Sequence, residues 1–404
     1  VRTELGRVRC VPIDVDAARD ATPGCEVVTH LNNAGSSLPP AVVVDTVIEY
    51  LRREAQIGGY EIADERQDDL ASVYTAAGAL FGGRPENWAF VESATRAWNA
   101  AFSALRFDPG DRIVTTRAEY PSNMGGLLRA GELQGVEVVI APDDRNGQVD
   151  VAALAGLLDE RTRLVSLVHV PTQGGLVNPV AEVGRLLRGS DILYQVDACQ
   201  SAGQLPVDVD EIGCDILSFT GRKFLRGPRG TGMVWASDRA LERMGNPAGI
   251  DGWGSSWDEP LRITPSPTAR RFEPYEVFFA GKVGLATALR YAADIGITDI
   301  AERNGALAGG LRDGLAALDG VVVRDQGLER CAIVTFTVAG HAPSDVQATL
   351  RAQAVNVSIA SQMSARLDFP RRGLDEVVRA SVHYFNTTDE VDALVSAIAA
   401  LGGT

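Results

Sequence analysis

Lysine is almost absent from this chain of 404 residues, because only Lys223 and Lys282 among its 38 basic residues are lysines. Arginine stays protonated and is a poor nucleophile, whereas a lysine amine that loses its proton can attack an aldehyde. A general preference for arginine explains the scarcity by itself. The residues around Lys223 decide whether this lysine is kept for chemistry that arginine cannot perform.

Cysteine and histidine are also scarce. The five cysteines are odd in number and show no Cys-x-x-Cys spacing, and the four histidines are scattered along the chain. These patterns argue against a disulfide framework and against a zinc centre, so we expect no metal site.

Long hydrophobic runs and an excess of basic charge are missing too. No apolar stretch reaches the roughly 18 residues of a membrane span, and the beginning of the chain contains no signal-like segment. The net charge is −15 and no basic patch is present, which disfavours nucleic acid and anionic membranes as partners. We expect a cytoplasmic protein.

What the sequence does contain is an alternation of short apolar runs and amphipathic stretches. We expect strands at 112–116, 136–140, 164–170, 192–196, 215–219 and 232–235. We expect helices at 41–56, 68–80, 151–158 and 181–187. Such alternation predicts an α/β fold with a mainly parallel sheet and helices on both faces. The predicted divisions are an N-terminal arm at 1–30, a large domain at 31–280 and a smaller C-terminal α+β domain at 281–404.

Three segments rich in polar side chains lie at or just past the ends of predicted strands. They are 116–123, 197–200 and 220–223. Open α/β sheets bind their ligands in the crevice at the carboxyl ends of the strands. These segments are therefore expected to meet in one site.

Two of these segments meet the main needs of pyridoxal phosphate. This cofactor needs a lysine for its aldehyde and a carboxylate facing its pyridine nitrogen. Lys223 is the lysine. Asp197 follows the apolar run 192–196, where a buried carboxylate costs free energy unless a cation pairs with it. Taken alone, Asp197 is more typical of a turn or a helix cap.

The phosphate and the ring have candidate partners as well. Thr95 and the amides that open the helical pattern at 97–105 suit a phosphate, although Ser93 there also suits an ordinary helix cap. Tyr120 can stack on the ring, although a lone aromatic residue more often belongs to the core. Gln200 can bind the ring oxygen, and its alternative is a plain surface position.

With these segments in place, the sequence resembles the class V aminotransferase family, which includes cysteine desulfurases and selenocysteine lyase-like and isopenicillin N epimerase-like proteins. The resemblance rests on Asp197-Ala198-Cys199-Gln200 and on the Lys223 segment that ends in Gly227-Pro228-Arg229-Gly230. It continues through 271–273, 378–382 and 384–387, and covers nearly the whole chain. It implies a fold-type-I enzyme with pyridoxal phosphate, a seven-stranded sheet, and a homodimer with shared active sites.

The resemblance also implies roles for single residues. Lys223, Asp197 and Tyr120 match catalytic positions, and Tyr120 stands where relatives often carry a stacking histidine. The cofactor-binding positions are Ala94, Thr95, Tyr120, Thr172, Asp197, Gln200, Thr220, Arg222 and Lys223. Arg379 matches the arginine that binds the substrate carboxylate, for which a guanidinium forms a bidentate pair; its alternative is a surface salt bridge. The segment that lines the substrate pocket is matched by Asn33, Ala34 and Gly35.

The chain departs from the family pattern at three places. Arg222 stands where relatives have histidine, and Pro274-Tyr275-Glu276 stands where desulfurases carry the Gly-Thr that reaches the partner's phosphate. Desulfurases also carry a nucleophilic cysteine before the carboxylate-binding arginine, and 332–379 contains none. A desulfurase that forms a persulfide on the protein is therefore disfavoured.

We expect β-elimination from a cysteine-derived substrate, which releases a thiol or sulfenate and requires no cysteine nucleophile. Transamination and epimerisation are the alternatives. A fourth is a pyridoxal-phosphate-binding protein without catalysis, against which the carboxylate-binding Arg379 argues. Lys282 is interpreted as an ordinary residue.

Overall fold

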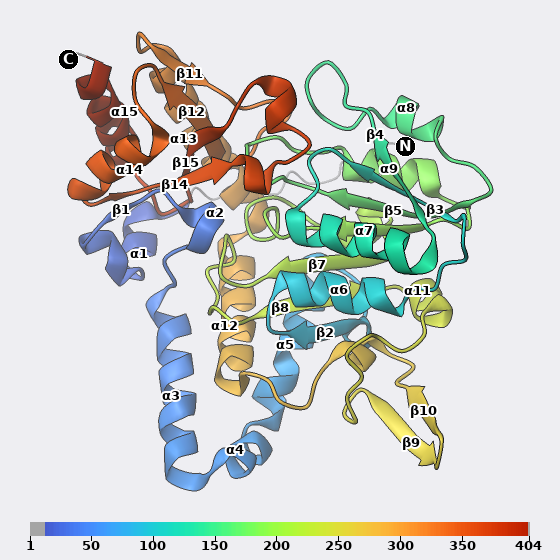
Figure 1. Ribbon diagram of the computed structural model, residues 1–404. Coiled ribbons are helices and arrows are strands. Elements are labelled where there is room, and N and C mark those ends of the chain that lie inside the picture. The colour runs from blue at the N-terminus through green and yellow to red at the C-terminus, as the bar shows by residue number, and fades with distance from the viewer. Residues whose placement is uncertain (1–12, 403–404) are drawn as a thin grey trace, which may run out of the picture.

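The computed structural model describes residues 13–402, and its largest element is a seven-stranded sheet of order β2-β8-β7-β6-β5-β3-β4. β8 runs antiparallel to both neighbours, and the other neighbouring pairs are parallel. The strands are β2 (Trp88–Val91), β3 (Arg112–Thr116), β4 (Glu137–Ala141), β5 (Thr162–Val168), β6 (Leu193–Asp197), β7 (Ile216–Thr220) and β8 (Gly232–Ala236). The predicted α/β fold with a mainly parallel seven-stranded sheet is confirmed (Figure 1).

Alternate residues of the strands pack into two cores on opposite faces of this sheet. On β7, Ile216 lies in one core and Leu217 in the other. Because successive side chains of a strand point to opposite faces, a continuous apolar run buries both. The first core also holds residues of α6 (Ala94–Ala104), α7 (Pro121–Gln134) and α11 (Asp238–Arg243). The second holds residues of α5 (Gln67–Phe81), α8 (Val151–Ala155), α9 (Val180–Leu187), α10 (Val209–Ile212) and α12 (Phe279–Ile295).

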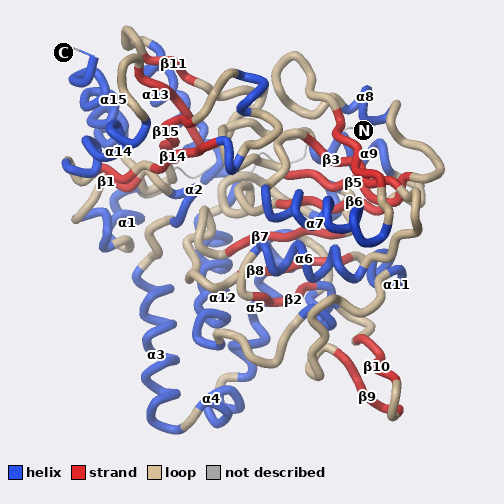
Figure 2. The backbone as a smooth tube through the Cα atoms, in the orientation of Figure 1, coloured by secondary structure: helices blue, strands red, loops and turns tan. Residues whose placement is uncertain are grey.

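A second, four-stranded antiparallel sheet follows, of order β11-β12-β15-β14. Its strands are β11 (Val321–Val323), β12 (Ile333–Val338), β14 (Ser358–Ser361) and β15 (Glu376–Ser381). Its core includes residues of α13 (Ile297–Ala316), α14 (Pro343–Ala352) and α15 (Thr388–Gly402). The two sheets form separate groups of strands in Figure 2.

The helix α12 lies at the predicted domain junction. Its residues Leu285 and Leu289 lie in a core of the seven-stranded sheet. We therefore propose that the large domain extends to the end of α12 rather than to residue 280. The other predicted limits stay predictions.

The elements that precede the large sheet in the sequence contact the C-terminal part of the chain. β1 (Thr29–His30) pairs in parallel with β13 (Val355–Asn356), and Arg19 of α1 (Val15–Asp20) forms an ion pair of 3.0 Å with Glu390. The helices α2 (Asn33–Ser36), α3 (Ala41–Ile57) and α4 (Gly59–Glu65) follow. Residues 1–12 of the predicted arm lie outside the described residues. Short 3-10 helices are found at Pro23–Glu26, Pro85–Asn87, Ala269–Phe272, Gln362–Ser364 and Phe369–Arg372.

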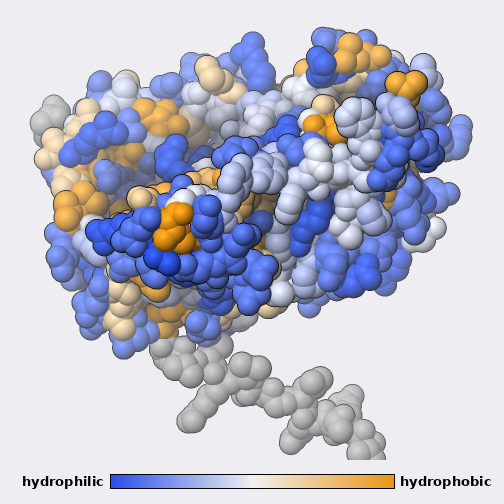
Figure 3. Space-filling model, turned by 90° about the horizontal axis from the view of Figure 1, so that it is seen from below, coloured by the Kyte–Doolittle hydropathy of each residue, from blue (hydrophilic) through white to orange (hydrophobic). Residues whose placement is uncertain are grey.

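A hairpin of β9 (Ser255–Glu259) and β10 (Arg262–Pro265) projects from the large sheet (Figure 1). Figure 3 views the molecule from the side of this hairpin and of α4, where hydrophilic side chains predominate and apolar groups are scattered between them. Within residues 13–402, no helix is long and apolar enough to cross a membrane.

Candidate active site

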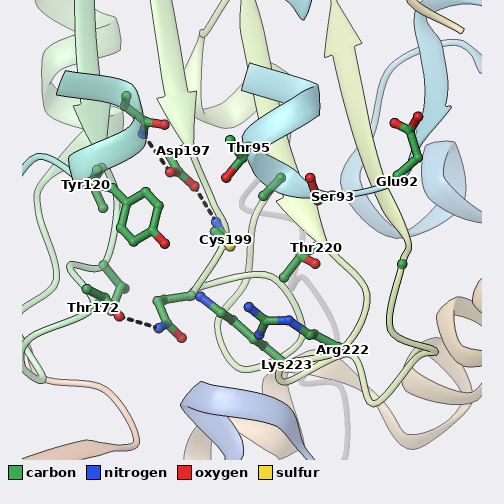
Figure 4. Close-up of a pocket in the computed structure, with 16 residues that line it drawn as sticks. Glu92, Ser93, Thr95, Tyr120, Thr172, Asp197, Cys199, Thr220, Arg222 and Lys223 are labelled. Carbon is green, nitrogen blue, oxygen red and sulfur yellow. Dashed lines mark hydrogen bonds between the residues drawn. The ribbon is translucent and has the colours of Figure 1, made fainter. Parts of the chain in front are cut away.

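A cavity lies where the carboxyl ends of four parallel strands meet. The chain leaves β3, β5, β6 and β7 into this cavity, and all three segments expected from the sequence contribute to it (Figure 4). The lining residues are Glu92, Ser93, Ala94, Thr95, Tyr120, Asn123, Val168, Val170, Thr172, Asp197, Cys199, Gln200, Thr220, Arg222, Lys223 and Gly230. All nine predicted cofactor-binding residues are among them.

Asp197 is a buried carboxyl group at the end of β6, with 4% of its surface exposed. Its Oδ1 accepts a hydrogen bond of 2.8 Å from the amide of Cys199, and its Oδ2 accepts one of 2.8 Å from Asn123 Nδ2. Burial raises the pKa of Asp197, and these donors oppose the rise. The hydrogen bond from the Cys199 amide is the contact expected of an ordinary turn aspartate. Asp197 also lines the cavity, however. A protonated ring nitrogen would be a suitable cation for it.

Lys223 follows β7 and is 7% exposed, with its side chain reaching into the cavity (Figure 4). Burial lowers the pKa of its amine, and the nearby guanidinium groups of Arg222 and Arg379 lower it further. Desolvation and neighbouring cations both favour the neutral amine, which is the nucleophilic form.

The opposite end of the cavity is formed by the start of α6. Ser93 caps this helix and accepts a hydrogen bond of 3.2 Å from the amide of Arg96, so the ordinary interpretation of Ser93 is correct. The remaining amides of the first turn and the hydroxyl of Thr95 are groups that suit an anion. Gly232 makes this turn possible, because a Cβ there would lie 2.6 Å from the carbonyl carbon of Ser93.

Arg222 turns toward the N-terminal segment. Its guanidinium donates a hydrogen bond to the carbonyl oxygen of Gly35 in α2. Gln200 makes a similar contact, because its Nε2 donates to the carbonyl oxygen of Ala34 at 3.2 Å. The predicted pocket segment therefore touches the cavity residues through its backbone.

Arg379, on β15, is 8% exposed and lies behind the cavity wall rather than among the lining residues. Its Nη1 donates to the carbonyl oxygen of Thr172 at 2.7 Å and to its Oγ1 at 2.9 Å, and its Nε donates to Ser358 Oγ at 2.9 Å. Burial lowers the pKa of Arg379 to about 10. No carboxylate of the described residues forms an ion pair with it, so the alternative of a surface salt bridge is wrong.

Asn33 has a different function from the one expected. It is fully buried, and its Nδ2 donates to the carbonyl oxygen of Ser381 at 2.7 Å, while its Oδ1 accepts from Ser37 Oγ at 2.7 Å. Its side chain therefore joins α2 to β15. Asn33, Ala34 and Gly35 are not among the residues that line the cavity.

Lys282 is not the ordinary residue that the sequence suggested. It is 9% exposed, and its amine donates to the hydroxyl of Tyr74 at 2.5 Å. That hydroxyl in turn donates to Glu273 Oε2 at 2.9 Å. Lys282 of α12 thus belongs to a buried polar network with Tyr74 of α5 and Glu273, outside the cavity.

The sequence interpretation also missed residues of the cavity. Asn123 and Val170 line it, and Cys199 lines it beside Lys223. Asn123 lies in the first turn of α7 and Val170 just after β5, positions that a helix or strand assignment alone marks as structural. Among residues 13–402, no group of three or more histidine, cysteine or acidic side chains could hold a metal ion.

These groups fit pyridoxal phosphate. An amine with a lowered pKa and a buried carboxyl group face one cavity whose far end is a helix N-terminus. Gln200 Oε1 is buried and has no hydrogen-bond partner, so its amide has capacity left for a ligand. Lys223 would hold the aldehyde, Asp197 the ring nitrogen, and the start of α6 the phosphate.

Known proteins are similar to this chain in sequence and in fold. A probable cysteine desulfurase of Halobacterium salinarum is 30% identical over 410 residues, which span 96% of each chain. A cysteine desulfurase of Dickeya dadantii is 29% identical over 91% of this chain and 90% of its own. The apo cysteine desulfurase from Thermococcus onnurineus superposes with a TM-score of 0.90 at 24% identity, over 97% and 99% of the two chains. The cystine C–S lyase C-DES, in complex with cysteine persulfide, superposes with a TM-score of 0.84 at 22% identity, over 94% and 99%.

The family described as Aminotransferase class-V matches residues 29–394, which is most of the chain. Its members bind pyridoxal phosphate, in agreement with the amine, carboxyl group and anion site of the cavity. The chain belongs to the class V aminotransferase family and is a pyridoxal-phosphate-dependent enzyme of fold type I.

Proposed function

We propose that this enzyme is a carbon–sulfur β-lyase that cleaves a cysteine-derived substrate without a cysteine nucleophile of its own. One observation carries the proposal: the chain between β14 and β15, which precedes Arg379, contains no cysteine. Its relatives are named for the removal of sulfur from cysteine. A substrate that already bears a leaving sulfur group needs no thiol from the protein.

The cysteines elsewhere support the same interpretation. Cys331 is 2% exposed and belongs to the core of the small sheet. Cys199 lines the cavity, but burial raises the pKa of its thiol, and a thiol that stays protonated is a poor nucleophile. A neighbour of the same fold, C-DES, is itself described as a cystine C–S lyase, so the fold accommodates this reaction.

The residues of the cavity have separate roles in such a reaction. Bound pyridoxal phosphate withdraws electrons from the Cα of an attached amino acid. Asp197 would keep the ring nitrogen protonated, and the amine of Lys223 would hold the cofactor aldehyde and carry the proton of the substrate Cα. Arg379 binds the substrate carboxylate and is oriented by Thr172. Tyr120, 36% exposed, covers the ring.

The phosphate and the ring oxygen have their own partners. The amides of Ala94 and Thr95 bind the phosphate beside Thr220, and Arg222 neutralises part of its charge. To bind the phosphate as well, the Thr220 hydroxyl would have to leave the carbonyl oxygen of Thr231, to which it donates at 3.0 Å. Gln200 faces the ring oxygen with its unpartnered Oε1, which can accept a hydrogen bond from a ring hydroxyl. Its Nε2 already lies 3.2 Å from Thr172 Oγ1, so the ring site and the carboxylate site share one hydroxyl.

We further propose a homodimer. Trp253 and Trp257 of the projecting hairpin region are 62% and 73% exposed, and Leu261 is fully exposed. Contact with a second chain would remove the apolar surface of these exposed side chains from water. Light scattering of the purified protein tests the assembly, and a monomer at micromolar concentration would refute it. The cytoplasmic location remains a prediction.

The reaction is tested by pyruvate release without any keto acid. The purified enzyme is incubated with S-substituted cysteines, cysteine sulfoxides and cystine, and pyruvate and ammonia are measured. A lyase produces both from at least one substrate. Product that forms only when a keto acid is supplied identifies a transaminase instead. Exchange of the Cα proton with solvent, with inversion and no other product, identifies an epimerase.

A further inference from the structure

A second buried carboxyl group, Glu119, lies beside Asp197. It is 6% exposed and occupies the turn between β3 and α7. Its carboxyl group accepts hydrogen bonds of 2.8 Å from Thr115 Oγ1, 2.8 Å from the amide of Tyr120 and 2.9 Å from Asn123 Nδ2. None of the roles described above uses this acid.

Asn123 joins the two carboxyl groups. Its Nδ2 donates to Asp197 Oδ2 at 2.8 Å and to Glu119 Oε1 at 2.9 Å, and the residue is 1% exposed. An amide nitrogen carries two hydrogens and the amide oxygen none, so two carboxyl acceptors fix the orientation of this side chain. Because Asp197 Oδ1 is held by the amide of Cys199, the carboxyl group of Asp197 is fixed from both sides.

Glu119 also contributes charge near the ring site. Burial raises its pKa to about 7, with the bond from Asn123 opposing the rise and the charge of Asp197 adding to it. Glu119 is therefore partly ionised at neutral pH. The other charged group that acts on this pair is Lys223, which lowers the pKa of Asp197. A negative charge near a pyridine nitrogen favours its protonated form.

We propose that Glu119 and Asn123 are positioning residues for the cofactor ring. Asn123 holds Asp197 in the orientation that faces the ring nitrogen. Glu119 holds Asn123 in place, adds the charge that keeps that nitrogen protonated, and fixes the turn that carries Tyr120. The inference rests on the fold and the cofactor and is independent of the proposed C–S lyase reaction, so either can fail without the other.

The test uses the full-length enzyme reconstituted with pyridoxal phosphate labelled with ¹⁵N in the ring. Glu119→Gln keeps the shape of the side chain and removes its charge. The control Glu132→Gln removes a charge from an exposed position of α7, the helix that follows Glu119. The ¹⁵N shift is followed against pH, and the dissociation constant of the cofactor is measured. In Glu119→Gln the ring nitrogen loses its proton about one pH unit lower than in wild type, and the dissociation constant rises about tenfold. Glu132→Gln matches wild type.

A second variant separates positioning from plain stability. Asn123→Ala leaves Asp197 held from one side only, so the cofactor dissociation constant rises about tenfold. The proposal is overturned if the ring nitrogen titrates as in wild type in both variants and both bind the cofactor with wild-type affinity. It is also overturned by a loss of thermal stability alone, with the ring nitrogen titrating as in wild type. If Glu119→Gln does not fold, Thr115→Val replaces it, because the loss of one donor reduces the charge of Glu119 and shifts the titration in the same direction.

Discussion

The buried guanidinium of Arg379 is expected to lower the unfolding free energy of the protein. The substitution Arg379→Gln removes the charge but keeps a polar side chain that can still donate toward Thr172. Because the guanidinium is the proposed partner of the substrate carboxylate, the variant should bind substrate poorly. Because the same group is buried without an acidic partner among the described residues, the variant should also be more stable than wild type.

The magnitude follows from the surroundings of Arg379. Burial lowers its pKa from 12.5 to about 10, a difference that corresponds to about 3 kcal/mol. Since the folded pKa lies below the unfolded one, this cost is fully present below pH 10 and disappears only as the pH rises toward 12.5. Glutamine loses about two of the hydrogen bonds to Thr172 and Ser358, each worth about 1 kcal/mol. The net gain in unfolding free energy is about 1 kcal/mol.

Two measurements on one variant check this reasoning. Urea unfolding of the cofactor-free protein at pH 7.5 should give a higher midpoint for Arg379→Gln. The kcat/KM for pyruvate release should fall about 100- to 1000-fold, the cost of losing one partner of a buried charge pair. Arg351→Gln, at an exposed position of α14, is the control and should change neither value. A lower midpoint together with an unchanged kcat/KM would refute both parts of the argument.

Further substitutions at four positions follow from the structure. Lys223→Ala should abolish the visible absorbance of bound cofactor and all pyruvate release; a variant that still turns over refutes its role. Thr172→Val removes the hydroxyl shared by Arg379 and Gln200, and should raise KM about tenfold with little change in kcat. Tyr120→Phe should keep the cofactor dissociation constant within about twofold while Tyr120→Ala raises it, because stacking requires only the ring. Lys282→Met should lower the unfolding free energy by about 1 kcal/mol, because the Tyr74 hydroxyl keeps its bond to Glu273 but loses the one that it accepts from Lys282, with the cofactor absorbance unchanged.

Six of the seven strands of the large sheet could be predicted because they are short apolar runs followed by a turn or polar residues, whereas β2 was not predicted and β4 is only partly buried. The same pattern is why Asp197 and Lys223 could be placed at strand ends from the sequence alone. The helix α7 was missed because Gly125, Gly126 and Gly131 interrupt its pattern. Asn123 in its first turn ends the predicted polar segment 116–123 but was given no role of its own.

Contacts between distant segments could not be predicted from local pattern. Arg379 was found through the resemblance, but its bond to Thr172 joins residues 207 positions apart. The acid Glu119 lies within the predicted segment 116–123 but was given no role, since only the folded turn brings Thr115 and Asn123 to it. Asn33 was assigned to the substrate pocket through the resemblance of its segment, whereas its side chain turns toward Ser381.

The burial of both lysines leaves the protein without a lysine amine at its surface, since Lys223 and Lys282 are 7% and 9% exposed. Reagents that couple to amines, including common fluorescent dyes and cross-linkers, will find little to react with on the folded enzyme beyond its terminal amine. Excess pyridoxal phosphate will likewise have few accidental attachment points. Reductive trapping of the cofactor should therefore label this enzyme at a single position, and the amount trapped should count its working sites directly.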